Sequence, residues 1–501
     1  MQSENGYVND QEPDIPEGAT LAALDLGSNS FHLIIAKIEH QEMRPVETLS
    51  EKVQLGADLK HCLLDTAAID RGLKCLARFK QVLDSVEPYR TRIVGTNALR
   101  RARNRRDFTQ QAEALLGIPV EVIYGREEAR LVYLGVAHTL ADDEASRLVV
   151  DIGGGSTEFI VGQRFEPVVL DSLQMGCVSY TQRHFKQGKI SAGRYRRAYQ
   201  AARLEVSHIR NRYKASRWSD CVGSSGTLQA IEGILIKSGW SASGITRSGL
   251  ANLERALLNF SHMDDIEIED LSENRRNVIL SGVAITAGIF DELGIEIMRS
   301  SRGALREGVI YDLQGRLLHE DVRERTIHAL MQRYGVDESN AATVEKRVRM
   351  LYQSTHESWQ LDRNQLNLLS WAARSHEIGM AISHKNFSRH GAYLLRNADL
   401  PGFSLEEQET MAQLVQHHRG KLYKADFKNR FKNEQQQLLR LICLLRLANL
   451  FKYVEQLEHL PDFSVVAHGD EIHLQFPDGW IKQHPLTKQE LKQEKILLAR
   501  T

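Results

Sequence analysis

A glycine-rich turn directly after an apolar run limits the possible folds of this chain more than any other feature. Residues 148–158 have the sequence Leu-Val-Val-Asp-Ile-Gly-Gly-Gly-Ser-Thr-Glu, which predicts a buried strand that enters a tight turn. Glycines in such a turn let backbone N–H groups approach a phosphate closely. Hard oxygen ligands at its two ends, Asp151 and Glu158, suit Mg²⁺. The alternative is an ordinary hairpin with solvated carboxylates. The candidate phosphate-binding residues here are Gly153, Gly154, Gly155, Ser156 and Thr157.

The same pattern occurs a second time near the N-terminus. Residues 21–30, Leu-Ala-Ala-Leu-Asp-Leu-Gly-Ser-Asn-Ser, repeat the order of apolar strand, aspartate, glycine and serine, and Asp25 corresponds to Asp151. Two copies separated by the length of a domain predict a duplicated fold with a cleft between its halves. Asp25 is therefore a third candidate metal ligand. The additional phosphate-binding candidates are Gly27, Ser28, Asn29 and Ser30.

Two further segments place polar groups at predicted helix starts. Residues 223–227, Gly-Ser-Ser-Gly-Thr, can present N–H groups and hydroxyls to an anion or can form a plain N-cap. The candidates in that segment are Gly223, Ser224, Ser225 and Gly226. Residues 125–130 place Glu127 and Glu128 in a first helical turn, where the helix dipole alone favours acids. On the residues alone, the structural interpretation of both glutamates is the stronger one.

The paired turns resemble the two phosphate loops of the exopolyphosphatase and guanosine pentaphosphate phosphohydrolase family, within the actin-like, sugar-kinase and heat-shock ATPase superfamily. Further matches at residues 125–130, 223–227 and 303–308 extend the resemblance over nearly the whole chain. It implies an α/β fold with two actin-like (ribonuclease H-like) domains and an inter-domain cleft. An all-α HD-like domain and a small α+β C-terminal unit would follow.

The resemblance also implies roles for individual residues. Glu128, with Glu127 as the fallback, would orient and deprotonate the attacking water, and Arg100 would face the phosphate. Mg²⁺ would be the cofactor, held by Asp25, Asp151 and Glu158. The segment after residue 303 would begin a helix that crosses back over the first half, and the protein would be a homodimer. His32 is predicted to be a structural strand histidine, whereas the five arginines within residues 100–106 fit a phosphate track and a solvated helix face equally well.

Strand and helix patterns alternate up to about residue 315, and helices dominate from there to about residue 453. The predicted organisation is a flexible tail (1–18), a first actin-like domain (19–131), a second (132–315), a helical HD-like domain (316–455) and the C-terminal unit (456–501). The last part shows an alternating hairpin pattern at residues 463–476 and a helix from residue 487.

The helical domain contains a degraded form of the metal motif of HD phosphohydrolases. His376 is followed by Glu377 instead of Asp, Asn449 stands where a second Asp is expected, and Asn340 stands where an earlier His is expected. A divalent site needs His and carboxylate ligands together, so no working metal centre is expected here. A basic, partly aromatic run follows His417 and His418, and it fits a polyanion track or a solvated face: Arg419, Lys421, Tyr423, Lys424, Phe427, Lys428, Arg430, Phe431 and Lys432.

Composition limits the partners and the compartment. The 501 residues carry 64 basic and 65 acidic side chains, so no global field attracts a polyanion, and no nucleic-acid partner is expected. Five cysteines without a C-x-x-C pair argue against disulfides and zinc and fit a reducing cytosol. The N-terminal segment lacks a signal-peptide pattern and no apolar run is long enough to span a membrane, so membrane contact would be peripheral.

These observations predict a phosphoanhydride hydrolase. Release of orthophosphate from inorganic polyphosphate by an exopolyphosphatase is favoured, on Gly155, residues 388–393 and the basic run. Removal of the 5′-γ-phosphate of guanosine pentaphosphate is the alternative. A sugar-kinase-like phosphotransferase and a non-catalytic phosphate or nucleotide sensor are the rivals from other classes.

Overall fold

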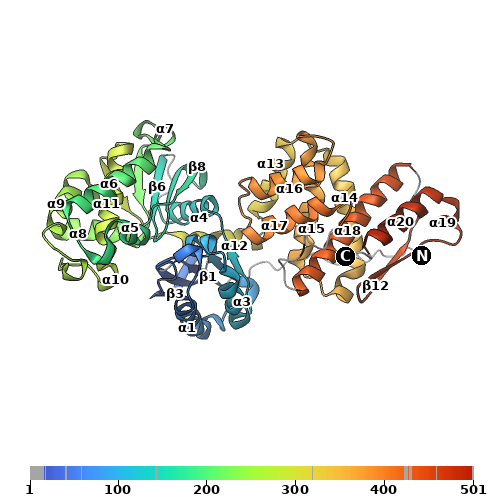
Figure 1. Ribbon diagram of the computed structural model, residues 1–501, viewed down its shortest axis with the longest axis horizontal. Helices are drawn as coiled ribbons and strands as arrows, with labels where there is room; N and C mark the ends of the chain where they lie inside the picture. Colours follow the sequence, from blue (N-terminus) through green and yellow to red (C-terminus); the bar gives the residue numbers. More distant parts are fainter. Residues whose placement is uncertain are drawn as a thin grey trace. The chain divides into compact units, whose positions relative to one another are not determined.

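The computed structural model describes residues 16–498 except 17, 40–41, 58, 141–144, 319, 423–426, 428–431 and 458–459. Nearly all of the predicted tail lies outside these residues. The chain forms two compact units, one ending at Val322 and the other beginning at Arg323 (Figure 1). No helix among the described residues is long and apolar enough to cross a membrane.

The first unit contains two sheets with the same plan. In each, a strand that ends in a glycine turn pairs antiparallel with the next strand on one side and parallel with a later strand on the other. The strand after the turn pairs antiparallel in turn with the third strand. The first sheet has the order β3-β2-β1-β4-β5 and the second the order β10-β11-β9-β6-β7-β8. The predicted duplication is therefore present in the strand order itself. The strands of the first sheet are β1 (Thr20–Leu26), β2 (Ser30–Glu39), β3 (Glu42–Lys52), β4 (Thr91–Gly95) and β5 (Val120–Val122). Those of the second are β6 (Ser146–Ile152), β7 (Thr157–Gln163), β8 (Glu166–Leu173), β9 (Asp220–Gly223), β10 (Ile245–Thr246) and β11 (Ile297–Ser300).

Helices cover both sheets, and their sequences explain where they begin. Asp65, Ser191 and Ser225 cap helices because their side chains accept hydrogen bonds from backbone N–H groups, as their residue types predict. The helices in the first half are α1 (Thr66–Leu83), α2 (Asn97–Arg101), α3 (Arg105–Leu116) and α4 (Gly125–Ala137). Those that follow are α5 (Cys177–His184), α6 (Ala192–Ser207), α7 (Arg210–Tyr213), α8 (Gly226–Lys237), α9 (Arg247–Leu257), α10 (Glu273–Arg276), α11 (Ile279–Leu293) and α12 (Leu305–Leu317).

Two helices, α4 and α12, exchange places between the halves. Helix α4 contacts β6, β7 and β8 of the second sheet, whereas α12 contacts β1, β2 and β4 of the first. Glycines let the two helices touch along their backbones: a Cβ on Gly308 would lie 1.8 Å from the carbonyl oxygen of Leu131, and one on Gly135 would lie 2.1 Å from that of Ala304. The helix after residue 303 thus crosses back over the first half. The predicted boundaries at residues 131 and 315 fall inside these helices.

A buried ionic network holds α12 in place. Asp312 accepts hydrogen bonds from Arg92 on β4 (2.6 Å), Arg316 on its own helix (3.0 Å) and Arg130 on α4. Arg130 also pairs with Glu127 at 2.8 Å. Because α4 carries Glu127 and Glu128 in its first turn, this network fixes the start of that helix.

The second unit is helical around one continuous core and ends in a hairpin and two helices. The hairpin, β12 (Ser464–His468) and β13 (Glu471–Gln475), appears where alternation predicted it, and Val465 and Ala467 belong to the same core as the helices. The α/β fold with two actin-like halves and a helical lobe is confirmed. The helices are α13 (Val322–Arg333), α14 (Glu338–Trp359), α15 (Arg363–Ser375), α16 (Phe387–Asn397), α17 (Leu405–His417), α18 (Lys432–Leu457), α19 (Trp480–Gln483) and α20 (Pro485–Leu498).

Candidate active site

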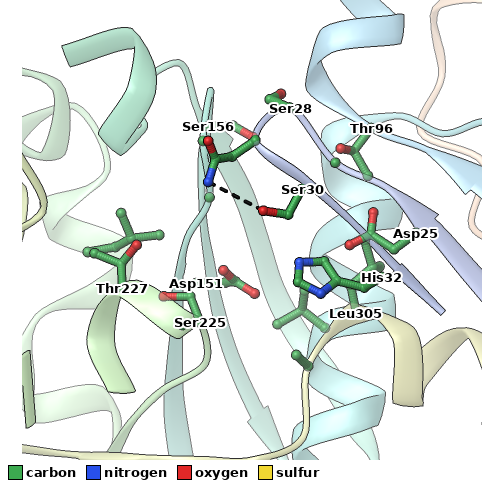
Figure 2. A pocket seen from close by; sticks show the side chains of 18 of the residues that line it. Asp25, Ser28, Ser30, His32, Thr96, Asp151, Ser156, Ser225, Thr227 and Leu305 are labelled. Carbon is green, nitrogen blue, oxygen red and sulfur yellow. Dashed lines mark hydrogen bonds between the residues drawn. The ribbon is translucent and has the colours of Figure 1, made fainter. Parts of the chain in front are cut away.

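The two glycine turns face one another across a cleft of about 270 Å³ in the first unit. An ideal Cβ on Gly154 would lie 3.1 Å from Cβ of Ser28 and 3.4 Å from the amide nitrogen of Asn29, so the turns nearly touch. Figure 2 shows Asp25 and His32 on one side of the space and Asp151 and Ser225 on the other. The predicted residues of both turns that line the cleft are Gly27, Ser28, Asn29, Ser30, Gly153, Gly154, Gly155 and Ser156.

Backbone N–H groups of neighbouring segments donate to the carbonyl groups of both turns and hold the turns open toward the cleft. In the first, Asn29 and Ser28 accept from the N–H groups of Gln54 and Gly56 at 2.8 and 2.9 Å. In the second, Gly154 accepts from Val178 at the start of α5 at 2.9 Å. Because the carbonyl groups are bound to the protein on these sides, the turns are fixed before a ligand arrives. Preorganised donors of this kind stabilise developing charge without reorganising during the reaction.

Four buried carboxylates meet at the cleft. Register pairs Asp151 directly with Glu158 across β6 and β7, and Asp25 and Glu128 also line the space. Burial, together with the charge of Glu128, raises the pKa of Asp151 to about 8. The pKa values of Asp25 and Glu158 are also raised well above their ordinary range, by burial first and then by the neighbouring carboxylates. The cleft therefore gathers four carboxyl groups, and burial and mutual repulsion disfavour the charged forms of three of them as long as no cation is bound.

This charge fits a divalent cation held partly through water and phosphate oxygens. Oδ1 of Asp25 is buried and has no hydrogen-bond partner among the described groups. Within the described ranges, no three His, Cys, Asp or Glu side chains form a complete cage for a metal ion. Mg²⁺ is commonly bound by one or two carboxylates plus waters and substrate phosphates instead of an all-protein cage. The donor set of Asp25, Asp151 and Glu158 is compatible with that kind of binding.

The structure separates the two glutamates that the sequence left as alternatives. Glu128 lines the cleft, whereas Glu127 pairs with Arg130 in the ionic network and does not line it. Burial raises the pKa of Glu128, and the charge and hydrogen bond of Arg100 oppose that rise. A buried carboxylate with an elevated pKa is suited to accepting a proton from water.

Arg100, to which the resemblance assigns a phosphate contact, lies against Glu128 and outside the lining of the cleft. Its guanidinium donates to Oε2 of Glu128 at 3.0 Å and to the carbonyl of Ile123 at 2.8 Å, and it does not line the cleft. The reason is that α2 aims this side chain at the strand end before α4. Arg100 therefore positions Glu128, and none of the four other arginines within residues 100–106 lines the cleft.

Three residues predicted to bind phosphate lie outside the lining. Thr157 is fully buried and its hydroxyl donates to the carbonyl of Met175. Ser224 is also buried, and its hydroxyl donates to Gly303 at 3.0 Å and to Asp151 at 3.4 Å, while Gly223 is paired in β9. The hydroxyl groups of Thr157 and Ser224 therefore donate to protein groups and not toward the cleft. In the third turn Ser225 and Gly226 line the cleft, and Ser225 also caps α8 by accepting from Leu228 at 3.2 Å.

The cationic side of the cleft was largely missed from the sequence. Arg275, Arg302 and Arg306 line it, and Arg275 donates to Thr227 at 3.3 Å. His32, predicted to be structural, also lines it, and burial together with Arg306 and Arg275 lowers its pKa to about 4. The cleft thus presents guanidinium groups opposite its carboxylates, as a site for a phosphate and a cation requires.

The degraded HD motif is packed in the core of the second unit. Lys452 donates to Glu377 at 3.0 Å, and the neighbouring His376, 3.5 Å away, together with Lys452 lowers the pKa of Glu377 to about 2. Asn340 bonds Asp337 in the first turn of α14. Most of the basic run falls outside the described residues, namely Tyr423, Lys424, Lys428, Arg430 and Phe431.

Comparison with known proteins agrees with the duplicated fold and the helical lobe. The model of the Ppx/GppA phosphatase family matches residues 34–317, and that of Ppx/GppA phosphatase domain III matches residues 322–495. The chain belongs to the Ppx/GppA phosphatase family. The resemblance inferred from the glycine turns is thereby confirmed, and so is the assignment to an enzyme family that acts on phosphoric anhydrides.

Relatives of similar length carry one shared name. The chain is 39% identical over 483 residues to a guanosine-5′-triphosphate,3′-diphosphate pyrophosphatase of Pseudoalteromonas translucida, with 96% of each chain covered. It is 37% identical over 480 residues to the protein of that name in Photobacterium profundum, again with 96% coverage of each.

Solved structures match about three fifths of the chain. The Ppx/GppA family member of Aquifex aeolicus is 27% identical and covers 60% of this chain and 98% of its own, with a TM-score of 0.51. An exopolyphosphatase from Cytophaga hutchinsonii, at 22% identity and a TM-score of 0.54, covers 59% of this chain and 97% of its own and shows the same fold.

Proposed function

We propose that this protein removes the 5′-γ-phosphate of guanosine pentaphosphate and yields guanosine tetraphosphate and orthophosphate. The observation that carries the proposal is the 39% identity, over 96% of both chains, to a relative named for that substrate. The sequence alone favoured inorganic polyphosphate. The named relatives favour the alternative instead.

The geometry of the cleft supports hydrolysis of a terminal phosphoanhydride. A volume of about 270 Å³, lined by three glycine turns and three arginines, suits a short phosphate chain. Backbone N–H groups and guanidinium groups would hold the terminal phosphates in line with an attacking water. Asp25, Asp151 and Glu158 would hold Mg²⁺, which when bound neutralises phosphate charge.

Glu128 supplies the base in this proposal. Its carboxylate would orient a water and take its proton as the water oxygen attacks the γ-phosphorus, and the bond from that phosphorus to the β-phosphate oxygen breaks. The electron pair of that bond leaves with the guanosine tetraphosphate. Arg100 would hold the Glu128 carboxylate in place through the 3.0 Å hydrogen bond.

Phosphate release from guanosine pentaphosphate, long-chain inorganic polyphosphate and ATP at equal concentration tests the proposal. We expect the highest kcat/KM for guanosine pentaphosphate, with one phosphate released per molecule and guanosine tetraphosphate as the nucleotide product on ion-exchange chromatography. Preferred turnover of polyphosphate would replace the proposal with the exopolyphosphatase reaction. Tight binding of guanosine pentaphosphate without any phosphate release would instead indicate a sensor.

A further inference from the structure

Ser172 contacts a residue of the cleft from outside the cleft. This serine lies on β8, and its hydroxyl group donates to Oε1 of Glu158 on β7 at 2.8 Å. Glu158 is 1% exposed and lines the cleft, whereas Ser172 does not line it. The serine can therefore act on the cleft only through its neighbours.

The register of the second sheet fixes this contact. Asp151, Glu158 and Ser172 are successive partners across β6, β7 and β8. Direct partners in neighbouring strands point to the same face of a sheet, so the three side chains form one row. The equivalent row of the first sheet ends in Ser50 on β3, which lines the cleft itself. The duplicated fold thus places a serine at the end of both rows, and in the second half that serine binds a carboxyl group instead of lining the cleft.

The start of α4 packs against the same serine. An ideal Cβ on Gly125, the first residue of α4, would lie 2.5 Å from both Cβ and Oγ of Ser172, so glycine is needed for this close approach. The next residue, Arg126, donates to the carbonyl of Leu170 on β8 at 2.9 Å. Because α4 carries Glu128 in its first turn, Ser172 contacts both one cleft glutamate and the helix that carries the other.

Both glutamates of the cleft are held by donors outside its lining. Arg100 donates to Glu128 at 3.0 Å, and Ser172 donates to Glu158 at 2.8 Å. Neighbouring carboxyl groups repel one another when they are ionised, and a side chain without such a donor can rotate away from its neighbour. The hydrogen bond from Ser172 restricts the last torsion of Glu158 and so keeps its carboxyl group facing the cleft.

We propose that Ser172 is a positioning residue that orients Glu158 for binding of a divalent cation. The inference rests on the proposed function in one respect, because it takes Glu158 as a ligand of Mg²⁺. Carboxylates that bind metals are themselves hydrogen-bonded, and loss of such an outer partner typically weakens metal binding or activity by about 10–100-fold. The donor here is a neutral hydroxyl group, so we expect the lower end of that range.

The substitution Ser172→Ala tests this role because it removes the donor and adds no bulk against Gly125. Mn²⁺ is the probe ion, and electron paramagnetic resonance measures its binding to the full chain in the presence of orthophosphate. The Mg²⁺ concentration at half-maximal release of phosphate from guanosine pentaphosphate is measured in parallel. Ser146→Ala is the matched control, since Ser146 begins the strand that ends near Asp151, lies outside the cleft lining and donates to the carbonyl of Arg217 at 3.0 Å.

We expect Ser172→Ala to weaken Mn²⁺ binding and to raise the Mg²⁺ requirement by about tenfold each, with kcat at saturating Mg²⁺ and the melting temperature close to those of the wild type. Ser146→Ala should change none of these quantities. A double-mutant cycle with Glu158→Gln shows whether the effect passes through Glu158. In that background Ser172→Ala should weaken Mn²⁺ binding by no more than about twofold, because a neutral amide binds the cation weakly in any orientation.

Unchanged Mn²⁺ affinity in Ser172→Ala, or an equal loss in both backgrounds, would overturn the inference even if Glu158→Gln weakens Mn²⁺ binding as expected. A melting temperature that falls together with the Mn²⁺ affinity would also overturn it, since the serine would then be structural. If the wild type does not bind Mn²⁺, or if Glu158→Gln binds it as tightly, the proposed metal site fails and the inference fails with it. Preferred turnover of polyphosphate would change only the proposed substrate, because Mn²⁺ binding is measured without substrate.

Discussion

The substitution Asp312→Asn should destabilise the first unit strongly, although it lies outside the active site. The Asp312 side chain is 4% exposed and contacts three guanidinium groups, from Arg92, Arg130 and Arg316. Asparagine keeps the volume, so no cavity forms, but it removes the negative charge that these arginines share. Breaking a buried ion pair by removing one partner typically costs about 3–5 kcal/mol.

The structure places the expected cost near the lower end of that range. Arg130 keeps Glu127 at 2.8 Å, and Arg92 and Arg316 keep Glu121 at 2.9 and 3.6 Å, so all three guanidinium groups retain a carboxylate. We expect a loss of about 3 kcal/mol in the free energy of unfolding. For a unit of this size the unfolding entropy is roughly 0.7 kcal/mol/K, so the melting temperature should fall by about 4 °C.

Calorimetry is the suitable assay because it can resolve separate transitions of the two units. Asp84→Asn serves as the control, since Asp84 is 61% exposed and its one ion pair among the described residues is with Lys80 at the surface. Exposed pairs of this kind contribute at most about 1 kcal/mol. A melting temperature for Asp312→Asn no lower than that of Asp84→Asn would refute the reasoning.

The same residue predicts a pH dependence. Burial alone would raise the pKa of Asp312, but Arg130, Arg92 and Arg316 outweigh it and hold the pKa well below its ordinary range. A carboxyl whose pKa is lowered in the folded state stabilises the fold fully above its unfolded pKa of about 3.9, and that contribution is lost as the pH falls below it. The stability difference between wild type and Asp312→Asn should therefore be constant near neutral pH and shrink below about pH 4.

Three further predictions concern the cleft. Glu128→Gln should lower kcat by about 10²–10⁴-fold and leave substrate affinity largely intact, and single-turnover kinetics with a binding assay check this; near wild-type kcat would remove Glu128 from the role of base. Asp151→Asn should raise the Mg²⁺ concentration needed for half-maximal rate, and an unchanged Mg²⁺ titration at full activity would show that Asp151 is structural. Gly155→Ala would place a Cβ 2.3 Å from Oδ1 of Asn97, so it should lower kcat/KM without a matching fall in melting temperature. The control Gly193→Ala, whose added Cβ has one contact at 3.9 Å, should change neither kcat/KM nor the melting temperature.

The sequence predicted the parts of the site that lie on a repeated local pattern. Asp25 and Asp151 each occupy the end of a strand before a glycine turn, and the sheet plan repeats around them. Such residues are found because the chain itself places the strand, the acid and the donors within about ten positions. Once two copies are recognised, the cleft between them follows.

The cationic residues of the cleft depend on contacts that no local pattern records. Arg275 lies in the four-residue helix α10, in a charged segment that has the composition of a solvated surface. It reaches the cleft because Gly226 leaves room: a Cβ there would lie 1.7 Å from the guanidinium. The direction of the Arg100 side chain could not be predicted either, because the five-residue sequence of α2 does not show whether that side chain points to the cleft or to Glu128.

The opposed charges of the cleft explain why phosphate and cation should bind together. Alone, an anion meets the arginines but also the carboxyl groups of Asp25 and Asp151, whose pKa values are raised by burial first and by the charge of Glu128 second. Alone, a cation lacks the phosphate oxygens needed to complete its coordination, because the described carboxylates form no full cage. Each ligand removes the charge that opposes the other, and linkage then requires that each raises the affinity for the other by the same factor. The Mg²⁺ requirement of wild type should accordingly fall as substrate concentration rises, and Asp151→Asn, by removing one of the opposing charges, should weaken that coupling as well as the affinity for Mg²⁺.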